Sequence, residues 1–297
     1  MRIEIVTDNI VVMYAPKELE LAINTAPTTA PVTCIALPER LIIVDTGIFV
    51  DVLANFRKEM EKKYNRKISH LLLTHLDWDH MFAMEVFEDV KTVASEHCIE
   101  NMKYNLTEGY LAKENLVEFA NNRYPKHKEM RDLVINAKLF LPTISVKDEL
   151  RIGPEENSLL FKVVGGHTKG SSIIYSSSEK TICVGDNLLE CYPPLQHEFN
   201  NPISIYKQLE ELDIEDVIPG HGKVVSKDYI IKTRKYYEDL EVFLKKSFSE
   251  DLSINQIQEH PQLPKYFAQG SPGWKFSCRP TDNWLQYLIE DFYETLK

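Results

Sequence analysis

The sequence predicts an α/β domain whose strands end in side chains able to bind metal. Short apolar runs have strand character, and longer amphipathic segments have helical spacing. His, Asp and Gly residues directly follow several of the apolar runs. The most informative segment is THLDWDH, residues 74–80, which carries four metal-capable side chains within six positions. A scaffold of strands that holds polar groups on its end loops is the predicted architecture.

The N-terminal part, residues 1–50, reads as β-hairpins, with strands at 32–37 and 41–44 around a short turn. Residues 51–64 then form a predicted amphipathic helix. Its apolar side consists of Val52, Leu53, Phe56 and Met60. The alternation of strand and helix signals places the next strand, residues 68–73, in the interior of the domain.

The cluster begins where that strand ends. On an extended chain His75 and Asp77 share one face, because side chains alternate with a period of two. Asp79 and His80 follow and open a helix predicted over 81–87, so their side chains can point back at the same spot. Imidazole and carboxylate groups are good ligands for zinc, iron or manganese.

Three later residues repeat the arrangement of a ligand-type side chain just past a short apolar strand. They are His167 after residues 159–164, Asp186 after 181–184 and His221 after 217–218. Glycines beside each of them allow close approach of the backbone. A single histidine after a strand is a weak signal, but four such sites in this order predict a metal centre.

With these motifs the chain resembles the metallo-β-lactamase fold superfamily over roughly residues 1–230. The match includes the element Val44-Asp45-Thr46-Gly47 as well as the cluster and the three later residues. The resemblance implies an αββα sandwich with a helical insertion at about 97–140 and a helical extension, residues 231–297, packed on the catalytic domain. It also implies that Asp45 supports the site through hydrogen bonds without binding metal.

The resemblance further implies two divalent metal ions, with zinc as the first expectation and iron or manganese as alternatives. One metal would take His75, Asp77 and His167, and the second would take Asp79, His80 and His221, with Asp186 bridging.

Asp77 departs from the family pattern, which has a second histidine at this position. The three aspartates and a bridging hydroxide would cancel the charge of two divalent metals, whereas a histidine here would leave one positive charge. The extra carboxylate should weaken Lewis acidity and favour harder ions. It is either a ligand exchange within a hydrolase or a sign of redox chemistry, since the flavodiiron branch of the superfamily has an acidic residue here.

The expected reaction is hydrolysis of a small ester, lactone, thioester or similar substrate by a metal-bridging hydroxide. Asp79 would bind metal, orient the nucleophile and pass its proton to the leaving group. Tyr192 is a candidate hydrogen-bond donor to the developing oxyanion, with packing in its proline-containing turn as the alternative. Lys169 either attracts an anionic substrate group or is a solvated lysine.

Two other functions stay open. A non-haem di-iron oxidoreductase is supported by Asp77, although no flavodoxin-like domain accompanies it. A non-catalytic ligand-binding protein on the same fold is the third, and it would bind ligand tightly without metal-dependent turnover. Fold alone does not decide among these functions.

Composition limits the partners and the compartment. A net charge of −11 argues against a broad nucleic-acid surface, because phosphate binding needs concentrated Lys and Arg. No run approaches the ~18–20 apolar residues of a membrane span, and the first residues do not resemble a signal peptide. The five scattered cysteines fit a reducing cytoplasm. We therefore expect a cytoplasmic protein with a small-molecule substrate, no nucleic acid and no membrane.

Two helical regions complete the prediction. The polar segment 96–137 is either a lid or wall over the site or a plain pair of scaffold helices. Helices are also predicted over 228–246 and 282–296. The apolar stripe of the last helix packs within the chain or forms a homodimer.

Overall fold

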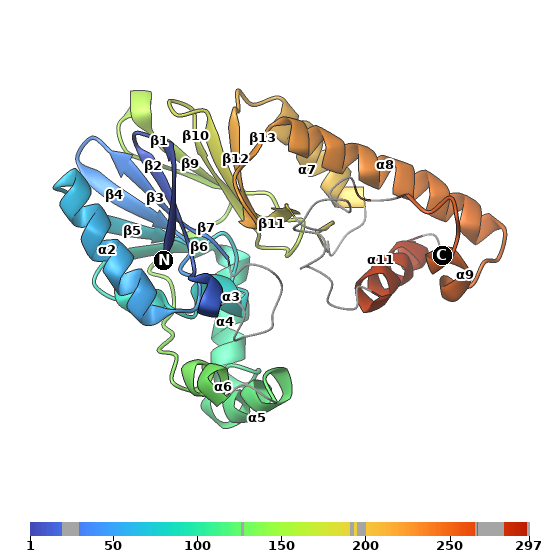
Figure 1. The fold of residues 1–297 in the computed structure, drawn as a ribbon, viewed down its shortest axis with the longest axis horizontal. Helices are drawn as coiled ribbons and strands as arrows, with labels where there is room; N and C mark the ends of the chain where they lie inside the picture. The colour runs from blue at the N-terminus through green and yellow to red at the C-terminus, as the bar shows by residue number, and fades with distance from the viewer. Residues whose placement is uncertain are drawn as a thin grey trace.

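The computed structural model describes residues 1–19, 30–125, 128–190, 193–194, 200–264, 266 and 282–295. Within these ranges two β-sheets pack face to face, and helices cover the outer face of each (Figure 1). The expected αββα sandwich is confirmed. The helices in the described ranges are not long and apolar enough to cross a membrane.

The first sheet has seven strands in sequence order. They are β1 (Arg2–Thr7), β2 (Ile10–Tyr14), β3 (Val32–Leu37), β4 (Arg40–Val44), β5 (Ile68–Leu72), β6 (Lys91–Ser95) and β7 (Ile144–Val146). The pairs from β1 to β4 are antiparallel, which confirms the predicted hairpin of β3 and β4. From β4 to β7 the pairs are parallel, so several strand ends meet at one edge of this sheet.

The second sheet has six strands. In spatial order they are β13 (Val225–Ser226), β12 (Asp216–His221), β11 (Thr181–Leu189), β10 (Ser172–Ser176), β9 (Leu159–Val163) and β8 (Glu149–Ile152). Most pairs are antiparallel, but β11 and β12 run parallel. Asp186 lies within β11, which continues past the end predicted at residue 184, and His221 ends the neighbouring strand β12.

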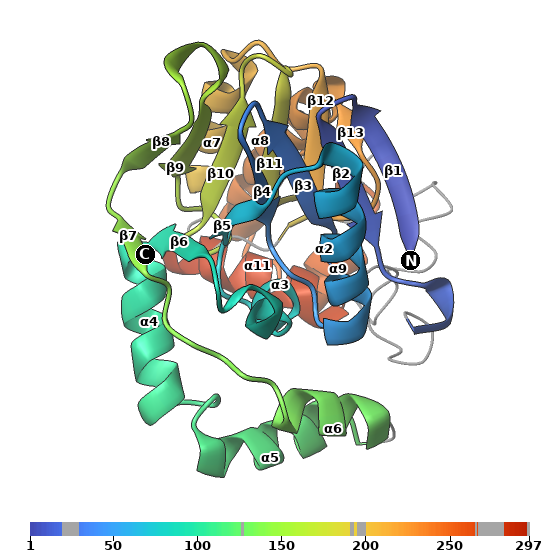
Figure 2. The same ribbon diagram turned by 90° about the vertical axis from the view of Figure 1, so that its left-hand side faces the viewer.

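The helices form the two outer layers. Beside the first sheet lie α2 (Val50–Tyr64), α3 (Trp78–Met81), the short 3-10 helix η1 (Met84–Phe87) and α4 (Glu96–Thr107), whereas α5 (Lys113–Arg123) and α6 (Lys128–Ile135) project beyond α4. On the second lie α7 (Asn200–Glu210), α8 (Asp228–Ser249), α9 (Ile254–Gln258) and α11 (Asp282–Thr295), and η2 (Glu155–Asn157) lies between β8 and β9. Figure 2 shows α4 leaving the end of β6, with α5 and α6 beyond it.

Central strands are buried on both faces, and this creates three apolar layers. In β4, Leu41 and Ile43 pack under the helices of the first sheet. Ile42 and Val44 instead face the second sheet, where they meet residues such as Phe161. Successive residues of the strand therefore pack into two different cores. Because both faces are buried, the sequences of these strands are unbroken apolar runs.

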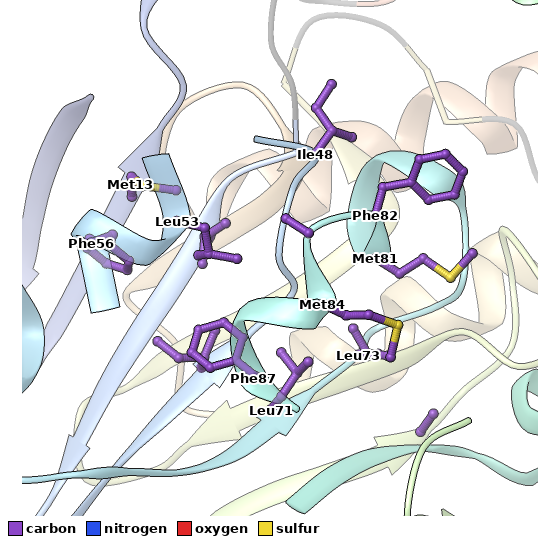
Figure 3. Packing of buried hydrophobic residues seen from close by; sticks show 14 of the residues in the cluster. Met13, Ile48, Leu53, Phe56, Leu71, Leu73, Met81, Phe82, Met84 and Phe87 are labelled. Atoms are coloured by element: carbon purple, nitrogen blue, oxygen red, sulfur yellow. The ribbon is translucent and has the colours of Figure 1, made fainter. Parts of the chain in front are cut away.

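The region around α3 packs tightly onto β5 and α2 (Figure 3). The sticks show side chains on or directly next to four consecutive elements, α2, β5, α3 and η1, namely Leu53, Phe56, Leu71, Leu73, Met81, Phe82, Met84 and Phe87. All of them are buried. The loop that carries the metal-capable cluster is therefore anchored by apolar contacts on both sides.

The helix predicted over 81–87 is wrong in its extent, because the chain forms α3 and η1 instead. The carbonyl of His80 accepts hydrogen bonds from the N–H of Thr46, at 2.8 Å, and from its hydroxyl, at 3.0 Å. The N–H of Ala83 donates to the carbonyl of Gly47, at 3.1 Å. These bonds to the loop after β4 replace the bonds that would continue the helix.

The C-terminal helices belong to the core of the second sheet. Tyr237 and Leu240 of α8 are fully buried against α7 and β11. In α11, Leu288, Ile289 and Phe292 are buried in the same cluster. The division predicted at residue 230 falls inside α8, and it stays a prediction, as does the homodimer.

The contact between the two sheets gives a first prediction. Phe161 is fully buried there, so Phe161→Ala should lower the free energy of unfolding by about 3–5 kcal/mol through lost burial and a residual cavity. Urea denaturation followed by circular dichroism measures the loss. Phe248→Ala is the matched control, because that ring is 38% exposed and should cost less than half as much. Equal losses would contradict the assigned packing.

Candidate metal centre

Four segments, two of them strands, bring the seven predicted ligand residues to one edge of the sandwich. The cluster from His75 to His80 follows β5, and His167 lies in the connection between β9 and β10. Asp186 lies on β11, where pairing with β12 is interrupted at Gly185. His221 is the last residue of β12. In Figure 1 the ends of β11 and β12 and helix α3 face the same side of the molecule.

Close backbone approach makes this meeting possible. Gly185 has a φ of +52°, and a Cβ added to it would lie 2.7 Å from the hydroxyl of Thr74. A Cβ on Gly220 would overlap the Asp186 carboxylate and lie 2.6 Å from the carbonyl carbon of Gly185. Gly185 thus lies against Thr74 at the end of the first sheet, and Gly220 lies against β11 of its own sheet, so closely that only glycine fits at both positions.

The first group of side chains contains His75, Asp77, His167 and Asp186, and its ligand atoms all lie within 4.8 Å of one another. Oδ2 of Asp77 lies 3.1 Å from Nε2 of His167 and 3.7 Å from Nε2 of His75. His75 is fully buried, whereas the Asp77 side chain is 45% exposed. Asp77 thus forms the open side of this group.

The second group contains Asp79, His80 and His221 within the same limit of 4.8 Å. Oδ2 of Asp79 lies 3.2 Å from Nε2 of His221. The ring centroids of His80 and His221 are 5.5 Å apart, and those of His75 and His80 are 4.1 Å apart. The two groups are therefore direct neighbours.

Asp186 faces both groups with different oxygens. Its Oδ2 lies 3.9 Å from Nε2 of His75 and 3.8 Å from Nε2 of His167. Its Oδ1 lies 3.0 Å from Nε2 of His80 and 3.5 Å from Nε2 of His221. This division of its two oxygens suits a carboxylate shared by two metal ions.

Several of these atoms lack hydrogen-bond partners. Among the residues that the structure describes, the buried Nε2 atoms of His75 and His80 and Oδ1 of Asp186 form no hydrogen bond. Nε2 of His80 and Oδ1 of Asp186 are close, but they are not aligned for a hydrogen bond. Unsatisfied buried polar atoms are costly. Ligands around zinc, with bonds of about 2.0–2.1 Å, lie about 3.3–3.4 Å apart in a tetrahedron. The side chains therefore fit a metal-binding role.

Asp45 orients two of the histidines from the side opposite the centre, His80 directly and His75 through Thr74. Its carboxylate accepts hydrogen bonds from the N–H of Thr74, at 2.8 Å, and from the hydroxyl of Thr74, at 2.7 Å. Nδ1 of His80 donates to the same carboxylate, at 2.8 Å. Because the Thr74 hydroxyl gives its proton to Asp45, Nδ1 of His75 donates to that hydroxyl, at 3.0 Å. Nδ1 of both rings is thus engaged in a hydrogen bond, and Nε2 is the atom that each ring directs at the centre for a metal.

Electrostatics favour a cation between these groups. Burial lowers the pKa of His75 to about 4, and a charge on His80 would lower it further, so His75 is neutral near pH 7. Burial alone would lower the pKa of His80, but the carboxylates of Asp186 and Asp45 raise it well above its usual value. Carboxylates that attract a proton to Nε2 of His80 would equally attract a metal ion to that nitrogen.

Other predicted residues have different places. Tyr192 lies outside the described residues, so its role stays a prediction. Trp78 packs against Phe82 and Tyr124, with ring centroids 6.1 and 5.8 Å apart, and so anchors the loop. Lys169 is exposed and borders a cavity next to Asp77.

That cavity is a feature that the motifs do not reveal. It has a volume of about 400 Å³ and is lined by residues of α4, by Tyr110 and by the loop that carries Asp77. Helix α4 belongs to the segment predicted as a lid or substrate wall. Tyr110 follows a glycine in a polar stretch without a recognisable motif, so only the tertiary structure identifies it.

Comparison with known proteins identifies the family of the chain. The model of the metallo-beta-lactamase superfamily matches residues 27–221, and the chain belongs to this superfamily. Its members typically bind divalent metals and are usually hydrolases. A comparison with curated proteins gives no match.

Solved structures show the same fold at low sequence identity. A metallo-β-lactamase from Pontibacter korlensis is similar with a TM-score of 0.55 and 14% identity, over 80% of this chain and 99% of that chain. The DIM-1 metallo-β-lactamase has a TM-score of 0.57 and 16% identity, over 80% and 96% of the two chains. VMB-1 has a TM-score of 0.57 and 14% identity, with the same shares covered. At these identities the similarity shows the fold alone.

The support from Asp45 gives a second prediction. Asp45→Asn removes the charge that orients Thr74 and His80, so affinity for zinc should fall about 10–100-fold. Competition with a chromophoric chelator measures this affinity. Asp51→Asn, at an exposed position of α2, should leave it unchanged. An Asp45→Asn protein with the affinity of the unmodified protein would show that this carboxylate does not support the ligands.

Proposed function

We propose that the protein is a dinuclear metal-dependent hydrolase that acts on a small ester, lactone, thioester or similar substrate. The observation that carries the proposal is the position of Asp186, whose two oxygens face two separate groups of side chains. One metal would be held by His75, Asp77 and His167. The other would be held by Asp79, His80 and His221, with Asp186 shared. When bound, the metals would lower the pKa of a water molecule and polarise the carbonyl under attack.

The protein's own groups would control the proton. Burial raises the pKa of Asp79, but a hydrogen bond from His221 and the charge of His80 outweigh this, so the pKa lies below its usual value. Asp79 is thus a carboxylate near pH 7 and can accept a proton. In the proposed reaction the oxygen of water attacks the carbonyl carbon, and the bond to the leaving group breaks. Asp79 takes the proton from water and gives it to the leaving oxygen or sulfur.

Substrate would reach the centre from the side of Asp77, and the opposite side is closed to water. The histidines of the first group are buried or nearly so, while Asp77 is half exposed and borders the cavity under α4. A substrate carbonyl can reach the centre from this cavity. The burial of the opposite side keeps the ligand atoms away from bulk water, which strengthens electrostatic interactions with the reacting group.

The proposal is tested by hydrolysis of para-nitrophenyl acetate after the protein is loaded with zinc, iron or manganese. We expect metal-dependent turnover without a redox partner. His80→Ala should lower kcat/KM at least about 100-fold and also reduce metal content, because replacement of even a residue that only supports a ligand costs about 10–100-fold.

His260→Ala provides the control, since that histidine packs against Phe243 on the C-terminal helices and should retain both activity and metal. Activity that survives chelation and His80→Ala alike would refute the proposed function.

Asp77 favours one alternative. A carboxylate in the first group, held 3.1 Å from Nε2 of His167, suits iron or manganese better than a histidine does. A di-iron oxidoreductase would therefore use the same residues. Consumption of oxygen or nitric oxide by the reduced, iron-loaded protein, with no ester hydrolysis by any metal form, would favour that function over the hydrolase.

Asp77 also gives a prediction about metal preference. Asp77→His replaces a hard oxygen ligand by imidazole, so the ratio of bound zinc to bound manganese should rise by at least about tenfold. Elemental analysis after growth with equal concentrations of both metals measures the ratio. The conservative variant Asp77→Glu keeps the carboxylate and should preserve the original preference. An unchanged ratio in Asp77→His would argue that this side chain does not bind metal.

A further inference from the structure

The cavity beside Asp77 is lined by the loop after β5, by α3 and α4, by Tyr110 and Leu111, and by Thr168 and Lys169 between β9 and β10. With a volume of about 400 Å³, it is in the range of about 300–1,000 Å³ that small-molecule sites occupy. It extends from the metal centre along α4. The question is which part of a substrate its walls would accept.

The inner wall is apolar. It consists of Met81 of α3, Cys98 and Met102 of α4, and Leu111 just beyond α4, all of them at most 5% exposed. Burial raises the pKa of the Cys98 thiol to about 11, so this side chain is uncharged near pH 7. Two methionines give the wall an adaptable shape. Such a surface gains free energy by covering hydrocarbon.

The outer rim is polar and includes the exposed side chain of Lys169. Asn101 and Asn105 stand on the exposed side of α4, and the amide of Asn105 donates to the carbonyl of Asn101, at 3.1 Å. Among the described residues that line the cavity, Asp77 is the only acidic one. A substrate with an apolar chain and a polar group at the end near Asp77 matches this distribution of apolar and polar side chains.

Tyr110 stands at the junction of the two surfaces. It lines the cavity together with Asp77, and its ring packs against Phe119 with centroids 4.9 Å apart. Burial raises the pKa of its phenol well above the usual value, and the charges of Asp77 and Asp79 raise it further. The hydroxyl therefore keeps its proton and can only donate a hydrogen bond to a carbonyl oxygen that enters from the cavity.

We propose that this cavity binds the acyl chain of the substrate, with the scissile carbonyl beside Asp77 and within reach of the Tyr110 hydroxyl. The inference rests on the proposed hydrolase function and specifies its substrate class as acyl esters or thioesters whose chain extends along α4.

The test uses the metal-loaded protein and para-nitrophenyl esters from acetate to decanoate. kcat/KM should rise about three- to fourfold for each added methylene, the effect of burying one methylene group, until the cavity is full. Binding is measured separately by titration calorimetry with octanoate and acetate. Octanoate should bind at least about tenfold more tightly.

Variants locate the effect. Met102→Ala removes part of the inner wall and so enlarges the cavity, which should move the preferred length of the acyl chain upward. Leu111→Ala is the second variant in case Met102→Ala does not fold. Met130→Ala is the matched control, because Met130 is a buried methionine of the same insertion and does not line this cavity.

Tyr110→Phe keeps the ring packing and should lower kcat at least about tenfold with KM nearly unchanged.

The outcomes separate the two proposals. Ester turnover with no dependence on chain length would overturn the acyl site and leave the hydrolase intact. Preferential octanoate binding that Met102→Ala or Leu111→Ala alters, without turnover of any ester, would support the acyl site and refute the hydrolase. Equal changes in Met102→Ala and Met130→Ala would show that the effect is one of general stability, and this too would overturn the acyl site.

Discussion

The carboxylate of Asp45 is the interaction on which the arrangement of the site depends. It joins the end of β4 to Thr74 at the end of β5 and to His80 in α3. Through the Thr74 hydroxyl it also reaches His75. One buried group therefore orients a histidine in each of the two ligand groups. Asp45 has a φ of +56°, a conformation that aspartate tolerates better than most residues, so the backbone itself turns this carboxylate inward.

The second constraint is the close approach of the two sheets. Gly185 lets β11 pass next to Thr74 of the first sheet, and within the second sheet Gly220 lets β12 pass next to Asp186. The centre thus lies at an edge of the sandwich where strands of both sheets hold the ligand-bearing connections. Rigid support of this kind holds ligand atoms within the narrow limits that a metal site requires. It also explains why atoms from segments more than a hundred residues apart, such as His75 and Asp186, share one small volume.

Much of this could be predicted from the sequence, for a physical reason. His75, Asp77, Asp79 and His80 are close in sequence, and their spacing on a strand end limits where their side chains can point. The hairpin of β3 and β4 and the helices α2 and α8 follow from local periodicity. The break between α3 and η1 could not be predicted, because it depends on hydrogen bonds from Thr46 and Ala83 across the fold. The cavity under α4 depends on how Tyr110 and Met102 meet the metal-site loop, which periodicity does not determine.

The most direct test of the account is anomalous diffraction at the zinc edge from crystals of the zinc-loaded protein. The account predicts two peaks with Asp186 between them, one beside His75 and His167 and the other beside His80 and His221. A single peak, or peaks away from Asp186, would contradict the central claim that this carboxylate joins two metal sites.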